Sequence, residues 1–455
     1  MEGKDEAEKQ RGEVWLDADD PDFFVTRVSS HKILSEFLST FKALNVISSR
    51  LPIGVETIYK PGKKMFIFMK KFILIILSYL LINFNSFVFS AEDKNKNLLK
   101  IGVLAPFSGE LEELGEEILY SINIALHDLG NPNVKIFPED SGSNNEKIVE
   151  ACEKLQINGI KIVIGPVESK LINKLYNCEN LIFISLSNMS SEINKNVLML
   201  GINLESQLLS IKNFITKMKR KKTLILFPKN NYTKHIEKNI SQINFANSKI
   251  YKYDQDPEKL TKQIEKLTNY KQRKINLNSR IKKLEGSDRP KDLRELNELK
   301  QKYTLGKVSF DSIIILDFGN SLKSVLTSLA YTDVSDEEIL IITSNQWFDK
   351  SLLEETSIKN LYFPSINFKN FEIFNKNFNS IYKYNPTEVS ILSYDAVGLI
   401  YYTWKKMGQI KSINDFNFKK DIKGKVGKFY ISDNKVIQRL NFYKIGKGNF
   451  IKYNF

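Results

Sequence analysis

Polar and aromatic side chains recur directly after the predicted strands of this 455-residue chain. In a parallel sheet such positions gather at one edge, where hydroxyls, amides and helix N-terminal N–H groups can hold a small polar or anionic ligand. Each of these residues could instead be a helix N-cap, which uses the same side chains for a structural purpose. Because the pattern recurs at six strand ends, we expect a ligand-binding cleft lined by Ser108, Glu168, Ser169, Ser187, Asn188, Tyr232, Phe318, Asn345 and Gln346.

The same sequence offers little material for catalysis. His127 and His235 are the only histidines after residue 90, too few for a histidine-based metal site or hydrolytic triad. The tripeptide Asp317-Phe318-Gly319 occurs in kinases, but no glycine-rich loop, strand lysine or catalytic Asp-Asn loop accompanies it. Dinucleotide-binding and phosphate-loop motifs are also missing from the sequence. We therefore predict a protein that is not an enzyme, with no catalytic residue, no metal and no cofactor.

Strand and helix patterns alternate regularly from Leu98 onward, and the series begins again near Asn203. Strands that alternate with single helices predict a mostly parallel, doubly wound sheet, so two series predict an α/β fold with two lobes. The pattern closes with a β-hairpin over 424–445. Cys152 and Cys178 are the two cysteines of the chain, and one disulfide is possible in an oxidising compartment.

The second series is interrupted by a basic, helical segment over 257–307. Its apolar residues keep a three-four spacing typical of a coiled coil, and the turn Gly286-Ser287-Asp288-Arg289-Pro290 divides it, which predicts an antiparallel helical hairpin. The segment holds 15 basic and 7 acidic residues, so it carries much of the net charge of +14. A charge concentrated in this way could steer an acidic partner, or be only a solvated face. We expect no nucleic-acid partner, because the chain carries an export signal.

That signal begins at Met69. Met69-Lys70-Lys71 is followed by the apolar run FILIILSYLL and by Val88-Phe89-Ser90, which predicts a secretory signal peptide over 69–90, cleaved before Ala91. The run of about ten apolar residues is too short to span a membrane. Asn occurs once in residues 1–68 and often afterwards. This change in composition indicates that two sequences of different origin meet near Met69, so we expect translation to start at Met69 or Met65. A genuine N-terminal extension is the alternative. The mature protein is predicted to be periplasmic, without a membrane span and without a lipid-attachment cysteine beside the cleavage site.

Four segments resemble the type 1 periplasmic binding-protein fold of the leucine-binding group: IGVLAPFSGELEELGEEILYSINIALHDL, IKIVIGPVES, FISLSN and SYDAVGLIYYTW. Within that group, the helical hairpin and the ending GKVGKFYISDNKVIQRLNFYKI are similar to the penicillin-binding protein activators of Gram-negative bacteria. The resemblance implies that the chain crosses between lobes near Asn203, Ser365 and Gly424. It thus implies a first lobe of 98–203 and 366–424 and a second lobe of 204–365 and 425–455, with the hairpin of 257–307 inserted in the second.

The resemblance also assigns roles at the cleft. Ser169 and Ser187 fit the hydroxyls that hold a ligand carboxylate, and Tyr232 fits an aromatic wall. Asn345 or Gln346 stands where amino-acid carriers have an acidic partner for the ligand ammonium, and a buried ammonium without a partner is costly. The first hypothesis is therefore an activator that contacts a membrane-bound penicillin-binding protein and so regulates peptidoglycan synthesis. The alternative is a substrate-binding receptor of an ABC transporter for amino acids or another small polar solute.

Overall fold

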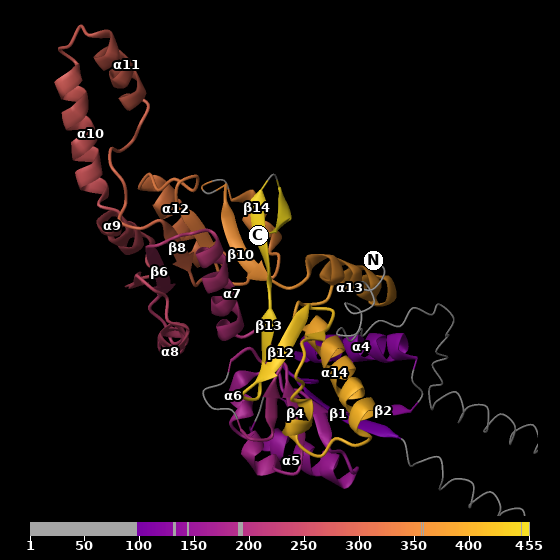
Figure 1. Cartoon of the computed structure of the whole chain (residues 1–455). Helices are drawn as coiled ribbons and strands as arrows, with labels where there is room; N and C mark the ends of the chain where they lie inside the picture. The colour runs from indigo at the N-terminus through magenta and orange to yellow at the C-terminus, as the bar shows by residue number, and fades with distance from the viewer. Residues whose placement is uncertain are drawn as a thin grey trace, which may run out of the picture. The chain divides into compact units, whose positions relative to one another are not determined.

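The computed structural model describes residues 98–454, apart from 131–132, 143–144, 190–193, 356, 358 and 447. The predicted extension over 1–68 and the predicted signal peptide over 69–90 lie outside the described residues. The chain is an α/β protein whose two mixed sheets form two lobes (Figure 1).

The first sheet has eight strands, and its central strands are parallel. The strands are β1 (Leu99–Ala105), β2 (Val134–Asp140), β3 (Ile162–Ile164), β4 (Ile182–Ser185), β5 (Val197–Met199), β11 (Ile422–Lys423), β12 (Lys428–Ser432) and β13 (Lys435–Arg439), in the order β11-β12-β13-β5-β4-β3-β1-β2. Strands β1, β3, β4 and β5 pair in parallel, as the alternating pattern predicts, and β12 is antiparallel to both β11 and β13. The helices of this lobe are α4 (Glu112–Leu129), α5 (Asn145–Ile157), α6 (Ser169–Ile172), η3 (Leu175–Cys178), α13 (Phe368–Tyr382), α14 (Ser390–Met407) and η5 (Ile413–Phe416).

The core of the first lobe lies between the short apolar strands and α5. All three residues of β3 are buried, as expected for a central strand that is covered on both faces. Cys152 of α5 and Cys178 of η3 lie inside this core and form a disulfide. Both cysteines of the sequence are therefore used in one bridge.

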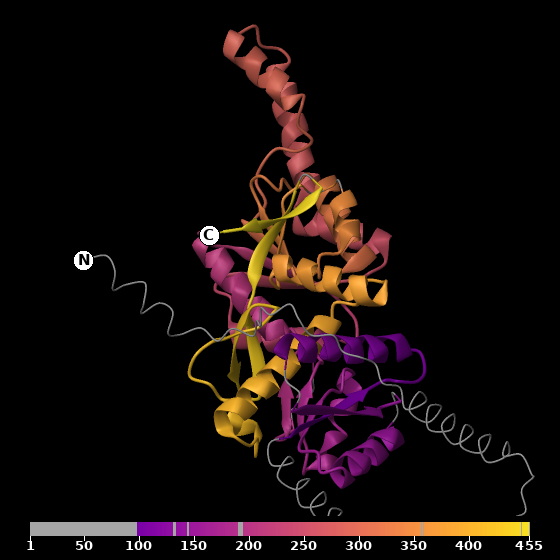
Figure 2. The same ribbon diagram turned by 90° about the vertical axis from the view of Figure 1, so that its right-hand side faces the viewer.

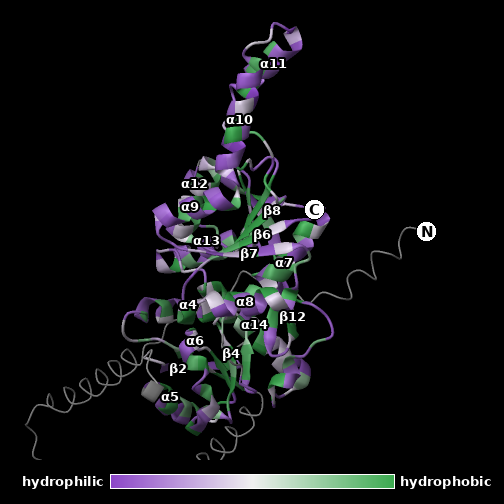
Figure 3. Ribbon diagram, turned by 90° about the vertical axis from the view of Figure 1, so that its left-hand side faces the viewer, coloured by the Kyte–Doolittle hydropathy of each residue, from purple (hydrophilic) through white to green (hydrophobic). Residues whose placement is uncertain are grey.

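The second sheet has seven strands. They are β6 (Thr223–Pro228), β7 (Ser248–Tyr253), β8 (Ser312–Ile315), β9 (Leu340–Thr343), β10 (Leu361–Ser365), β14 (Asn441–Gly446) and β15 (Asn449–Tyr453), in the order β15-β14-β10-β9-β8-β6-β7. The five strands from β10 to β7 are parallel, and β14 is antiparallel to both β10 and β15. Its helices are α7 (Leu204–Lys217), α8 (Thr233–Ile243), α12 (Gly319–Tyr331) and η4 (Lys350–Glu354). Figure 3 shows that hydrophobic residues are concentrated in strands such as β6 and β8.

The last crossing between the sheets differs from the expectation. We expected it near Gly424 and expected 424–445 to form one hairpin, but β12 and β13 belong to the first sheet and only β14 and β15 belong to the second. The reason is that the segment leaving β5 binds β13: the side-chain amide of Asn203 donates to Val436 O at 2.8 Å, and Gln438 N donates to Ser206 Oγ at 3.0 Å. The crossing therefore lies at residue 440.

The segment over 257–307 forms three helices: α9 (Pro257–Leu267), α10 (Tyr270–Leu284) and α11 (Pro290–Leu299). Figures 1 and 2 show α10 and α11 side by side, and four leucines and Ile281 pack between them. The expected continuous first arm is broken at Asn269, which has a positive φ of 50°. Leu260 and Ile264 of α9 are buried, and α9 packs on α12 of the second lobe. Helix α9 is therefore part of the core of the second lobe, and only α10 and α11 form the predicted hairpin.

Removing only the outer part of this segment should leave the lobe intact. Leu305 N donates to Arg273 O at 3.0 Å, so a Gly-Ser-Gly-Ser loop can replace 275–303 without straining its ends. We expect the free energy of unfolding to change by less than about 1 kcal/mol, because the apolar residues between α10 and α11 are removed together. By contrast, Ile264→Ala should lower the free energy of unfolding by about 2–5 kcal/mol, because it leaves a cavity in the core of the second lobe. Denaturant unfolding measures both, and a large loss of stability in the truncated chain would contradict this division.

Candidate functional site

The predicted site residues fall into two sets, each at one edge of one sheet. Ser108, Glu168, Ser169, Ser187 and Asn188 follow β1, β3 and β4, which are neighbours in the first sheet and run parallel. The second set follows the neighbouring strands β6, β8 and β9 of the second sheet: Tyr232, Phe318, Asn345 and Gln346. No hydrogen bond joins a member of one set to a member of the other within the described part of the chain. Their joint role in binding a ligand stays a prediction.

Ser108 is engaged by an acidic residue that the sequence did not single out. Its hydroxyl donates to Asp140 Oδ2 at 2.6 Å, and the Lys147 ammonium lies 3.1 Å from both of these oxygens. The other oxygen of Asp140 accepts from the N–H groups of Phe107 and Gly142, both at 2.8 Å. Partial burial raises the pKa of Asp140, but the hydrogen bonds from Ser108, Gly142, Lys147 and Phe107 outweigh it and lower the pKa to about 2. Ser108 thus helps to close the turn after β1, which is a structural role.

Glu168 and Ser169 lie at the start of the short helix α6. Glu168 Oε1 is 3.0 Å from the Lys170 ammonium, whereas its Oε2 is buried and has no hydrogen-bond partner among the described residues. A carboxylate oxygen in this state is unusual, because buried polar atoms are nearly always hydrogen-bonded. Among the predicted residues of the first lobe, Glu168 therefore has the most unused hydrogen-bonding capacity.

Ser187 and Asn188 form a tight turn after β4. The Ser187 hydroxyl donates to Met189 O at 2.9 Å and accepts from Met189 N at 3.3 Å, and Ser187 is buried. Asn188 is exposed. The hydroxyl that the resemblance assigns to a ligand carboxylate is therefore occupied by its own backbone.

Two of the four residues in the second set are held by the protein itself. Asn345 N donates to Gln207 Oε1 at 2.9 Å, and Asn345 Oδ1 accepts from the Ser365 hydroxyl at 2.8 Å. The side-chain amide of Gln346, which is buried, donates to Asp317 O at 2.9 Å. Tyr232 and Phe318 are 52% and 71% exposed. Two aromatic side chains are therefore accessible, whereas both amides have partners within the lobe.

Sequence reasoning overlooked Asp317, which directly follows β8 and is buried. Its carboxylate accepts hydrogen bonds from the hydroxyls of Tyr253 and Ser321 and, at 2.9 Å, from Phe318 N. Burial raises the pKa of Tyr253, which keeps its hydroxyl protonated as a donor. The available signal in the sequence was an acidic residue directly after the buried apolar run 313–316. This carboxylate is already satisfied and is not free to pair with an ammonium.

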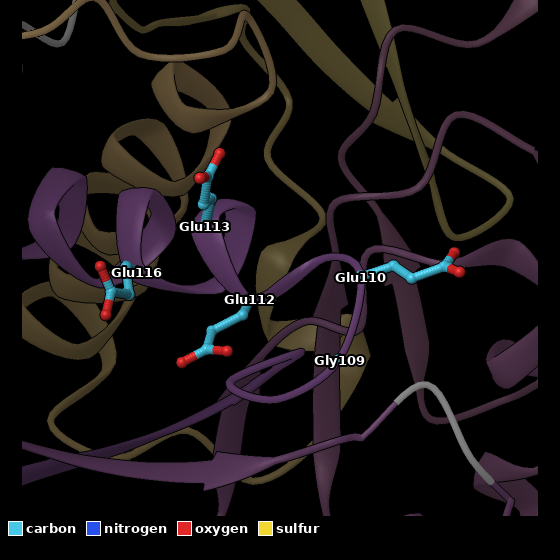
Figure 4. Close-up of a pocket in the computed structure, with 5 residues that line it drawn as sticks. All are labelled: Gly109, Glu110, Glu112, Glu113 and Glu116. Carbon is cyan, nitrogen blue, oxygen red and sulfur yellow. The ribbon is translucent and has the colours of Figure 1, made fainter.

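A hollow of about 360 Å³ lies at the start of α4, lined by Gly109, Glu110, Glu112, Glu113 and Glu116 (Figure 4). The carboxylates of Glu110, Glu112 and Glu113 point in different directions, so they do not converge on one point. Glu112 and Glu113 lie in the first helical turn, where negative charge stabilises the positive end of the helix dipole. The acidic residues are thus explained by the helix. No group of three potential metal ligands occurs in the parts of the chain that the structure describes.

The comparison with protein families covers the N-terminal part of each lobe. Residues 91–299 match the LppC putative lipoprotein family. The resemblance noted from the sequence is thereby confirmed, and the match begins at Ala91, the residue predicted to start the mature protein. No curated protein matches the chain.

Solved structures of LpoA share the fold of this chain. The C-domain of LpoA (YraM) from Haemophilus influenzae, described as a regulator of PBP1A, is 15% identical with a TM-score of 0.52, over 78% of this chain and all of that domain. Full-length LpoA from the same organism gives 14% identity and a TM-score of 0.53, over 79% of this chain. The match covers 59% of the length of full-length LpoA.

A structure described as a transporter protein shares the same fold. A putative branched-chain amino acid ABC transporter protein from Rhodospirillum rubrum is 11% identical with a TM-score of 0.56, over 78% of this chain and all of that one. At these identities the likeness establishes the two-lobed fold of the periplasmic binding proteins and not the ligand. Of the helices that the structure describes, none is long and apolar enough to cross a bilayer.

The structural role of Ser108 and Asp140 predicts a specific pH dependence. Because folding lowers the pKa of Asp140 from 3.8 to about 2, its contribution is present above pH 4 and is lost as the pH falls towards 2. Asp140→Asn should lower the free energy of unfolding at pH 7 by only about 1 kcal/mol, because solvent screens part of the interaction. The difference between the variant and the wild type should vanish near pH 2, where the wild-type carboxyl is protonated. Denaturant titrations at several pH values measure it. Glu150→Gln is the control: the Lys154 ammonium lowers the pKa of this carboxyl too, but solvent screens the exposed pair, so its pH-dependent loss should be much smaller.

Proposed function

We propose that this protein is a non-enzymatic periplasmic binding protein that regulates peptidoglycan synthesis through contact with a penicillin-binding protein. The observation that carries the proposal is the combination of the LppC match with the fold of the LpoA C-domain, a regulator of PBP1A. A contact of this kind needs a stable scaffold and an exposed surface, and it requires no catalytic group.

The chemistry of the predicted cleft residues supports a protein-contact role over solute transport. Asn345 and Gln346 are neutral, Ser187 is bonded to its own turn, and Asp317 is satisfied by two hydroxyls and an N–H group. A zwitterionic amino acid needs an available counter-charge for its ammonium, because an unpaired buried charge costs several kcal/mol. The second lobe supplies no such available charge at these positions.

The disulfide supports the proposed compartment. Bridges such as Cys152–Cys178 form and persist in oxidising environments, of which the bacterial periplasm is one. The predicted cleavage before Ala91 would deliver the chain there, and the family match starts at the same residue.

The proposal is tested with the chain from Ala91 onward and the purified PBP1A of the same organism. We expect saturable binding in surface plasmon resonance, and a changed rate of glycan-strand synthesis or cross-linking when the two are mixed. The putative branched-chain amino acid ABC transporter protein of Rhodospirillum rubrum serves as the control, because it shares the fold and should neither bind nor alter the rate. Absence of both binding and a rate change would reject the regulatory function.

The alternative function, a solute receptor of an ABC transporter, is favoured by the TM-score of 0.56 to the putative branched-chain amino acid transporter protein. We expect leucine, isoleucine and valine to bind weakly or not at all, because the ammonium lacks a free carboxylate in the second lobe. Isothermal titration calorimetry measures this directly. Micromolar binding, which corresponds to about −8 kcal/mol, would favour the receptor over the regulator.

A further inference from the structure

Helix α10 is strongly basic on its own. Its 15 residues include Lys271, Arg273, Lys274, Arg280, Lys282 and Lys283, and no acidic residue. The neighbouring helix α11 has three acidic and two basic residues, so the positive charge of the pair lies on α10. A helix that only needed solubility could carry both signs, which would stabilise it through pairs one turn apart.

The two arginines of α10 have structural partners. Arg273 is buried and donates to Thr332 O at 3.0 Å, Asp333 O at 2.8 Å and Thr304 Oγ1 at 2.7 Å, which fixes the base of α10. Arg280 forms a bidentate pair with Glu295 of α11, at 2.7 and 2.8 Å. Both arginines therefore position the helix, and neither is available to a partner.

The four lysines of α10 are exposed and form no ion pair with any described residue. Lys271, Ile275 and Lys282 are four and seven residues apart, so they share one face of the helix. Ile275 is 55% exposed in the middle of this face, and the Lys274 ammonium lies over the Tyr270 ring. The face is about 16 Å long from Lys271 to Lys282, at 1.5 Å per residue. An apolar side chain flanked by charged residues matches the apolar centre and polar rim of a protein interface.

We propose that this face of α10, which carries Lys271, Ile275 and Lys282 and is flanked on its two sides by Lys274 and Lys283, docks an acidic surface of a partner protein. The inference rests on the proposed function, since the partner protein is the penicillin-binding protein. The charge of the four lysines attracts the acidic surface and accelerates association, and Ile275 supplies a desolvated contact at the centre. Because the leucines between α10 and α11 and the anchor at Arg273 hold the helix, the face is presented in one orientation.

The composition of the hairpin favours a protein over an anionic membrane. The turn that joins α10 to α11 contains Glu285 and Asp288, which an anionic lipid surface would repel, and it has no apolar residue from Glu285 to Arg289. Peripheral membrane helices instead carry a broad apolar face beside their basic residues. On α10, Ile275 is the one large apolar side chain that is strongly exposed.

The test compares two variants that each remove four positive charges. The first carries K271Q, K274Q, K282Q and K283Q, and glutamine keeps the helix because its helix propensity is close to that of lysine. The matched control carries K161Q, K234Q, K238Q and K249Q at exposed lysines elsewhere. Binding to PBP1A is measured at 50, 150 and 300 mM NaCl. The wild-type affinity should fall at least tenfold across this range, and at 150 mM the first variant should bind at least tenfold more weakly than the control.

A third variant, Ile275→Ser, should raise the dissociation rate with little change in the association rate, because it removes a short-range contact and no charge. Equal affinity of the two lysine variants would overturn this inference while leaving the proposed function intact. Failure of the wild type to bind PBP1A would overturn both. Sedimentation with phosphatidylglycerol vesicles completes the test: lysine-dependent vesicle binding together with unchanged PBP1A binding would assign the face to a membrane and overturn the proposal.

Discussion

The buried carboxylate of Asp395 joins the segments on which the two-lobed arrangement depends. Asp395 lies on α14 with no exposed surface, and it accepts hydrogen bonds from Lys425 N at 2.7 Å and Val426 N at 3.0 Å. Val426 O in turn accepts from Asn367 N at 2.8 Å, just after β10. A Cβ at Gly424 would lie 2.3 Å from the carboxylate, so only glycine permits this approach. A buried charge must be hydrogen-bonded, and here the backbone between α14 and β12 satisfies it.

Other buried carboxylates in this chain act in the same structural way. Glu117 of α4 accepts from Thr387 N at 2.8 Å and from the hydroxyls of Thr387 and Ser390, so it caps the start of α14. Asp317 holds the end of β8 through Tyr253 and Ser321. The acidic groups inside the lobes are thus used to hold backbone and loops together.

The same fold serves regulators and solute-binding proteins, so chemistry at particular positions must distinguish them. A solute receptor needs unpaired polar groups at the strand ends, because the ligand has to replace the water that those groups lose. In this chain Ser187, Asn345 and Gln346 already have partners, whereas the lysines of α10 form no ion pair with any residue that the structure describes.

The sequence alone determined the order of strands and helices, since runs such as Ile313–Ile315 and periodic helices such as α4 record burial locally. It also predicted the two lobes and the positions of the site residues along the chain. It could not decide which sheet would take β12 and β13, because a strand has the same alternation in either sheet. Nor could it show that α9 packs on α12, that Asp140 binds Ser108, or that Asn345 and Gln346 are occupied. Those outcomes depend on hydrogen bonds and contacts between residues far apart in the chain, which only the tertiary structure brings together.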